Sequence, residues 1–149
     1  MDILTMLLLT LFIFGMAKWC DEGETLVGNV FLRKDAPGDL WVGLYTDDPE
    51  PAEDATLSSI TELAVANGYA RIALINTEWT EQATKGVFLQ LQKIFTANGG
   101  DWGSVYGYFL TNCASGTAGK LASVEHFSDG PYVVNDGWSV KVTPKVTIS

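Results

Sequence analysis

Few residues in this sequence have the type and spacing that a catalysed reaction needs. His126 is the only histidine, and it lies in residues 120–127 (KLASVEHF), where strand alternation places the neighbouring Glu125 on the opposite face. A nucleophile and its general base normally require a histidine beside a serine or cysteine. We therefore expect His126 to be a surface residue at a strand end, and the protein not to be an enzyme.

Two other motifs suggest ligands only superficially. Residues 116–120 (GTAGK) resemble a phosphate-binding loop, but they are too short for a P-loop and lead into a predicted strand, so they predict a hairpin turn. Residues 47–54 (DDPEPAED) carry five carboxylates without the spacing of an EF-hand, which favours a solvated loop over a calcium site. Glycoside hydrolysis needs two opposed carboxylates, and no pair here recommends itself. We assign no catalytic, cofactor-binding or metal-binding residue.

The two cysteines do not indicate a metal site or a disulfide framework. Cys20 and Cys113 are far apart in the sequence and belong to no Cys-x-x-Cys motif. We expect two free thiols.

The aromatic residues are more informative than the ionisable ones. The chain has five Trp, five Tyr and seven Phe, most of which should build the core. In residues 101–108 (DWGSVYGY), however, glycines alternate with rings and leave them open to a partner. The candidate protein-interface residues are Trp19, Trp102, Tyr106 and Tyr108. Residues 17–24 are a candidate arm that orders on a neighbouring subunit, and Trp102 with Trp138 would be the stacking platforms of a carbohydrate-binding module.

Net charge argues against two classes of partner. Eighteen acidic and nine basic residues give a formal charge of -9. A chain of this charge repels phosphate backbones and anionic lipid at long range. We expect neither nucleic acid nor a membrane as a partner.

The elements that must position these residues are mostly short strands. Apolar spacing predicts helices over 24–32 and 56–66, and alternation or β-branched and aromatic content predicts strands over 40–46, 69–76, 86–96, 104–111, 120–127, 132–134 and 138–149. Asn67-Gly68 suits positive backbone φ, and Pro144 marks an edge strand or a break between two short strands. The pattern predicts a mainly β fold, an antiparallel β-sandwich or jelly-roll-like barrel with one or two short helices in the N-terminal half.

The first fifteen residues differ from the rest. Residues 3–14 (ILTMLLLTLFIF) are apolar but shorter than the roughly 20 residues that span a bilayer as a helix. Asp2 stands where a signal peptide carries basic residues, and Met16 offers an alternative start that would make residues 1–15 an upstream extension. We expect a hydrophobic extension over 1–15, which is an untranslated extension, a signal or a hydrophobic arm, and one β-rich domain over 16–149.

Seven segments in order are similar to a family of small structural proteins of tailed bacteriophages. They are residues 19–24 (WCDEGE), 41–48 (WVGLYTDD), 68–71 (GYAR), Trp79, 105–109 (VYGYF), 127–131 (FSDGP) and 142–144 (VTP). The resemblance covers about residues 17–149, and residues 1–15 depart from the family pattern. It implies a β-sandwich-like virion subunit without a cofactor, which decorates or cements the capsid surface. Its partners would be the major capsid protein and its own copies, in a homo-oligomer; the alternative is a tail-associated or receptor-binding virion subunit.

Overall fold

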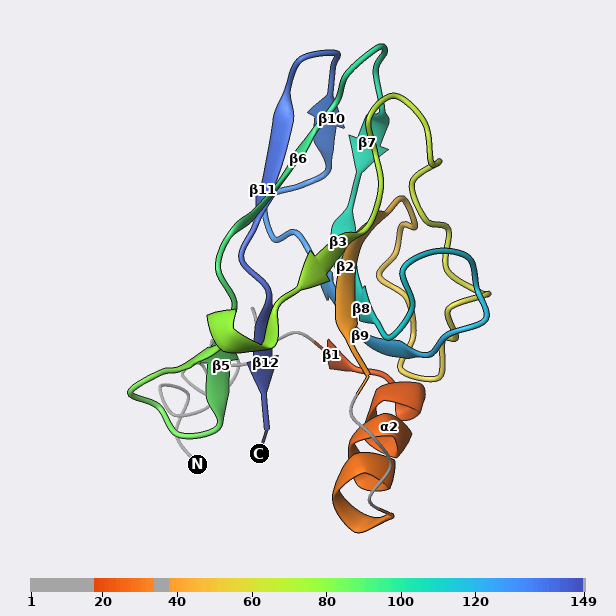
Figure 1. The fold of residues 1–149 in the computed structure, drawn as a ribbon. Coiled ribbons are helices and arrows are strands. Elements are labelled where there is room, and N and C mark those ends of the chain that lie inside the picture. Colours follow the sequence, from red (N-terminus) through yellow and green to blue (C-terminus); the bar gives the residue numbers. More distant parts are fainter. Residues whose placement is uncertain (1–17, 34–37, 149) are drawn as a thin grey trace, which may run out of the picture.

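The computed structural model describes residues 18–33 and 38–148, which form a mainly β fold with one α-helix in the N-terminal half (Figure 1). All strand pairs between named strands are antiparallel. The predicted fold class is confirmed. The predicted extension over residues 1–15 lies outside the described residues.

The centre of the fold is a five-stranded sheet with the strand order β1-β9-β8-β2-β3. Its strands are β1 (Lys18–Trp19), β9 (Leu121–His126), β8 (Gly107–Thr111), β2 (Leu40–Tyr45) and β3 (Ile72–Leu74). The predicted hairpin turn around residues 116–120 lies in the loop between β8 and β9. Every residue of β8 is buried, because both faces of this part of the sheet are covered.

Two ribbons cover one face of the sheet. β6 (Lys93–Thr96) pairs with β11 (Ser139–Val142), and β7 (Gly103–Val105) pairs with β10 (Tyr132–Val134). Leu44 and Leu110 of the sheet share a buried cluster with Phe95, Val134 and Val140 of the ribbons, so the packing is sandwich-like. In Figure 1 the ribbons lie at the end of the molecule opposite the helix.

A three-stranded sheet lies beside the helix end of the molecule. It consists of β12 (Lys145–Thr147), β5 (Val87–Leu89) and β4 (Thr80–Glu81), and the short 3-10 helix η1 (Asn76–Glu78) precedes it. The single strand predicted over 86–96 is thus two strands, because Gln90 turns inward and its side chain bonds the Ile75 carbonyl. The predicted break at Pro144 separates β11 from β12 and is confirmed.

The loop between β2 and β3, residues 46–71, has no helix or named strand and covers the other face of the sheet. We call it the covering loop. Leu57 and Ile60 pack there against Tyr45, Phe109 and Val124. The helix predicted over 56–66 is therefore wrong, since its apolar residues anchor turns instead. The Leu63 amide, for example, donates to the Leu44 carbonyl of β2. At the end of this segment Asn67 and Gly68 have φ of 50° and 84°, as predicted for that turn.

The helix α2 (Asp21–Leu32) begins three residues before the predicted range 24–32. Acidic residues fill its first turn, which suits the positive end of the helix dipole. Glu22 accepts hydrogen bonds from the Leu121 amide and the Lys120 ammonium, each 2.9 Å long. Residues 18–24 are therefore ordered against β9 of their own chain, and the predicted arm over 17–24 that orders on a neighbouring subunit is wrong for the described part.

Candidate protein interface

Two of the four predicted interface rings contribute to the packing of their own chain. The indole N–H of Trp19 donates to the Thr147 carbonyl at 2.8 Å. The indole N–H of Trp102 donates to the Asn67 carbonyl at 2.9 Å, and its ring packs edge-on against Tyr69 with centroids 5.9 Å apart. Both rings are half-buried, so each keeps only part of its surface for a partner.

The other two predicted rings differ in burial. Tyr106 is half-buried, and its ring lies 5.9 Å from that of His126. Tyr108 is only 3% exposed, and its hydroxyl donates to the Glu125 carboxylate at 2.6 Å. Contrary to the expectation, Tyr108 is a core residue. The strand β1, which carries Trp19, and the strand β7, which Trp102 precedes, lie at different levels of the fold in Figure 1, so the four residues do not make one face.

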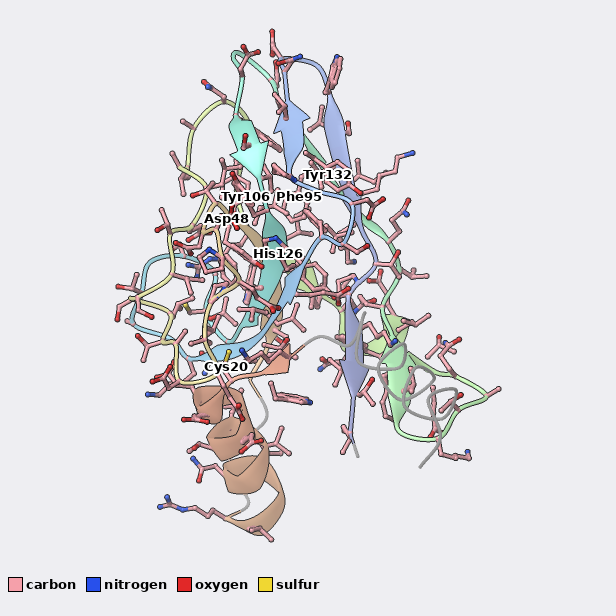
Figure 2. All side chains as sticks on the ribbon, turned by 180° about the vertical axis from the view of Figure 1, so that it is seen from behind. Cys20, Asp48, Phe95, Tyr106, His126 and Tyr132 are labelled. Carbon is pink, nitrogen blue, oxygen red and sulfur yellow. The ribbon has the colours of Figure 1, made fainter. Side chains whose placement is uncertain are left out.

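Four other apolar side chains are exposed at the ribbon end of the molecule. This ribbon-end patch consists of Ile94, Tyr132, Val133 and Trp138, with 53%, 40%, 57% and 60% of their surface exposed. Figure 2 labels Tyr132 among the ribbons, well away from the Cys20 end of the sheet. Tyr132 and Val133 are consecutive in β10 and point to opposite faces of its ribbon, so the four side chains lie around this end of the molecule and not on one flat face. Exposed large apolar side chains are typical of protein contact surfaces.

The strand register explains why Ile94 points outward. Ile94 pairs with Lys141 on the outer face of the β6–β11 ribbon, while Phe95 and Val140 pair on the inner face. Sequence reasoning did not select Ile94 or Val133, and it named Trp138 only as a possible sugar platform. The alternation through Val87 and Leu89 could not place Ile94, because the strand breaks between them, where Gln90 is buried and Leu91 is 59% exposed.

A buried polar cluster that sequence reasoning missed centres on Arg71. Its guanidinium makes five hydrogen bonds: Nε and Nη2 to the two Glu62 carboxylate oxygens, Nη2 to the Gly116 carbonyl, and Nη1 to the Cys113 carbonyl and thiol. The guanidinium has five N–H donors, so none remains for a ligand. The Tyr69 hydroxyl also donates to Glu62, at 2.8 Å. The cluster joins the covering loop and the β8–β9 loop to the sheet.

The ring of His126 is hydrogen-bonded within the fold. Its Nδ1 lies 3.2 Å from the Tyr45 hydroxyl. Burial, with smaller contributions from Glu50 and Asp47, raises the pKa of Tyr45 well above its usual value, so the phenol stays neutral. A neutral phenol can donate its proton to Nδ1 and hold the ring of His126, the last residue of β9, in place.

The acidic loop forms an open pocket of about 480 Å³ whose lining includes Asp47, Asp48 and Asp54. Asp47 is already engaged, because its carboxylate accepts a 2.6 Å hydrogen bond from the Thr61 amide. Across residues 18–33 and 38–148, no three His, Cys, Asp or Glu side chains are grouped closely enough to hold a metal ion. Both cysteines are free thiols.

Glu125 is the carboxylate whose protonation is coupled to folding in an unusual direction. Burial raises the pKa of Glu125, although the hydrogen bond from Tyr108 and the charge of Lys145 oppose the shift. The folded protein therefore holds this proton more tightly than the unfolded chain does. Ionised Glu125 therefore lowers the stability of the folded protein above its raised pKa. This loss of stability disappears as pH falls through the raised pKa towards 4.5, the ordinary pKa of a glutamate.

We therefore expect the pH dependence of stability to change when Glu125→Gln removes this titration. The glutamine keeps an oxygen that accepts from Tyr108, so the packing is preserved. As pH falls from 7 to 4.5, the free energy of unfolding of the parent protein should rise relative to that of the variant. Urea unfolding of both proteins measures this difference. All other carboxylates titrate in both proteins, so the difference isolates Glu125. A difference that stays constant over this range would contradict the assignment.

Comparison with known proteins yields no relative from which a function could be transferred. No protein-family model matches the chain. No curated protein matches it either.

In the described ranges, no helix has the length and apolar character that crossing a membrane requires.

Proposed function

We propose that this chain is a structural subunit of a tailed-bacteriophage particle, and that it decorates the capsid by docking its ribbon-end patch on neighbouring shell proteins. The assignment to a phage particle rests on the resemblance of the seven ordered segments to the phage family. The docking surface rests on one observation, the exposure of Ile94, Tyr132, Val133 and Trp138 at one end of the fold.

The charge and packing of the chain support a contact function over a chemical one. The guanidinium of Arg71 and the ring of His126 both have partners within the fold, and the acidic loop is pinned through Asp47. The ribbon-end patch combines an indole, a phenol and two branched aliphatic side chains, and aromatic residues are enriched at protein interfaces. The net charge of -9 favours solubility of the free subunit before assembly.

A decoration subunit acts through number more than through the strength of one contact. A specific interface buries about 1,000 Å² or more, and a shell presents the same interface many times. Each occupied site adds a contact that must break before the lattice opens. The partners are then the major capsid protein and further copies of this chain.

The exposed indole of Trp138 favours one second candidate, a tail-associated subunit that stacks this ring on a host sugar. Trp102 contributes less to such a site, because its indole N–H and its ring edge are engaged by Asn67 and Tyr69. The same face would then bind a glycan in place of a shell protein.

Mass spectrometry of purified particles, with heads and tails separated, tests the proposal. Copy numbers in the hundreds on heads would support capsid decoration. A few copies confined to tails would support host attachment instead, and absence from both fractions would overturn the virion assignment.

The ribbon-end patch is tested by the substitution Trp138→Ser. A central aromatic residue of an interface usually contributes more than 1 kcal/mol, so we expect rebinding to protein-depleted heads to weaken by about tenfold or more. Thermal stability should hardly change, because 60% of Trp138 is exposed. Val65→Ser is the matched control, since Val65 is 74% exposed in the covering loop, outside the patch. Equal binding by both variants would exclude the patch.

A further inference from the structure

A groove at the end opposite the ribbons is open to an apolar occupant. It has a volume of about 360 Å³ and lies between α2 and β12, with its walls formed by Trp19, Glu24, Val27, Gly28, Thr147 and Ile148. This volume is near the lower end of the usual range for ligand pockets, about 300–1,000 Å³. The groove therefore suits a few apolar side chains.

The glycine in the wall leaves part of this space open. A Cβ added to Gly28 would meet no atom within 4 Å, although the residue lies in the middle of α2. Ile148 on the opposite wall is 53% exposed. The helix and the strand thus face each other across unfilled apolar space.

An unsatisfied hydroxyl lies in the groove wall. Among the described residues, Thr147 Oγ1 is one of two buried side-chain polar atoms without a hydrogen-bond partner. Thr147 lines the groove, and its carbonyl accepts the indole N–H of Trp19, another wall residue. Buried polar groups are nearly always paired, so the free Thr147 hydroxyl indicates that this wall lacks a polar partner.

An apolar segment precedes the groove residue Trp19 in the sequence. Residues 3–14 are apolar except for Thr5 and Thr10 and lie outside the described residues. Phe14 precedes Lys18 by four residues, which is at most about 14 Å of extended chain, and Trp19 follows at once in the groove wall. So short a tether gives an effective concentration in the millimolar range, which favours this segment over an occupant that is not covalently attached.

We propose that the groove between α2 and β12 binds apolar side chains from residues 3–14 of the same chain. Their side chains fill the space over Gly28 between Val27 and Ile148, and a peptide or threonine group of the segment pairs with the free Thr147 hydroxyl in the groove wall. The proposal does not depend on the ribbon-end patch or on the virion assignment.

Photo-crosslinking of the full chain tests this directly. p-Benzoylphenylalanine replaces Phe12 or, in a second protein, Phe14, and irradiated samples are digested and sequenced by mass spectrometry. We expect crosslinks to residues 24–28 and 147–148 in a product of monomer mass. Crosslinks elsewhere in the chain, no crosslink, or groove crosslinks only in a product of dimer mass would overturn the proposal. The same photo-reactive residue at Tyr132, at the other end of the fold, should leave α2 unlabelled.

Hydrogen exchange of the full chain gives a second readout. The double variant Leu7→Asp/Leu8→Asp places charge in the apolar run without changing any described contact. Amides of α2 and of residues 145–148 should exchange at least tenfold faster than in the parent protein. The control Ile94→Asp, which adds a charge at an exposed position in the ribbon-end patch, should leave these amides unchanged. Equal exchange in the double variant and the parent protein would contradict docking.

Discussion

Replacing Arg71 with methionine is expected to lower the free energy of unfolding by about 3–5 kcal/mol, the usual cost of breaking a buried ion pair by removing one partner. The Arg71 side chain is 2% exposed and its Nη2 lies 2.6 Å from the Glu62 carboxylate. The substitution leaves that carboxylate without its cation, it removes the guanidinium donor to the Cys113 carbonyl, and it leaves the Gly116 carbonyl with only the weak Cys113 thiol donor. Methionine preserves much of the apolar volume against Phe109, whose ring lies 5.2 Å below the guanidinium.

Urea unfolding at pH 7 measures this effect, and an exposed ion pair supplies its control. Lys85 pairs with Glu81 at 3.4 Å, but the Lys85 side chain is 87% exposed. Lys85→Met should therefore change the free energy of unfolding by less than about 1 kcal/mol. Adding Glu62→Gln to Arg71→Met removes the unpaired charge and should recover part of the loss. Similar values for Arg71→Met and Lys85→Met would show that the cluster is not a main source of stability.

The Arg71 cluster also shows where sequence reasoning stops. Nothing in the spacing of Glu62, Arg71 and Cys113 indicates that they meet, because each lies on a different segment joined only by tertiary packing. The same packing explains the failed helix over 56–66. Its periodic apolar residues satisfied a helical pattern, yet Leu57 and Ile60 gain more by burial under the sheet than the backbone gains from helical hydrogen bonds.

Elements with strong local signals were predictable. The turn at Asn67-Gly68 requires positive φ, and the break at Pro144 follows from the missing N–H, so neither depends on distant contacts. The candidate interface was less accessible. Tyr108 lies in a strand that is buried on both faces, where alternation carries no information about which ring reaches the surface. Trp138 and Ile94, by contrast, lie on a ribbon with one open face.

Two glycines of α2 should respond in opposite directions to the same substitution, Gly→Ala. A Cβ on Gly23 would lie 2.7 and 2.8 Å from the carbonyl carbon and Cα of Ala122, and closer still to its oxygen. These are backbone atoms of β9, which is hydrogen-bonded in the central sheet between β1 and β8, so the helix must move. Forced overpacking commonly costs about 1–3 kcal/mol, and we expect Gly23→Ala to lie near 3 kcal/mol, because displacement also lengthens the hydrogen bond from Leu121 to Glu22.

Gly28→Ala places the same methyl group five residues further along the helix, where nothing lies within 4 Å. One methyl group takes up little of a groove of about 360 Å³, so apolar side chains docked there need to shift only slightly, and we expect no clash with the described residues. Alanine is favoured over glycine inside a helix by about 0.5–1 kcal/mol, and the free energy of unfolding should rise by that amount. Urea unfolding of both variants measures the pair. If both substitutions lowered the free energy of unfolding, α2 would tolerate an added methyl group at neither glycine. Close contact of Gly23 with β9 would then not explain the loss.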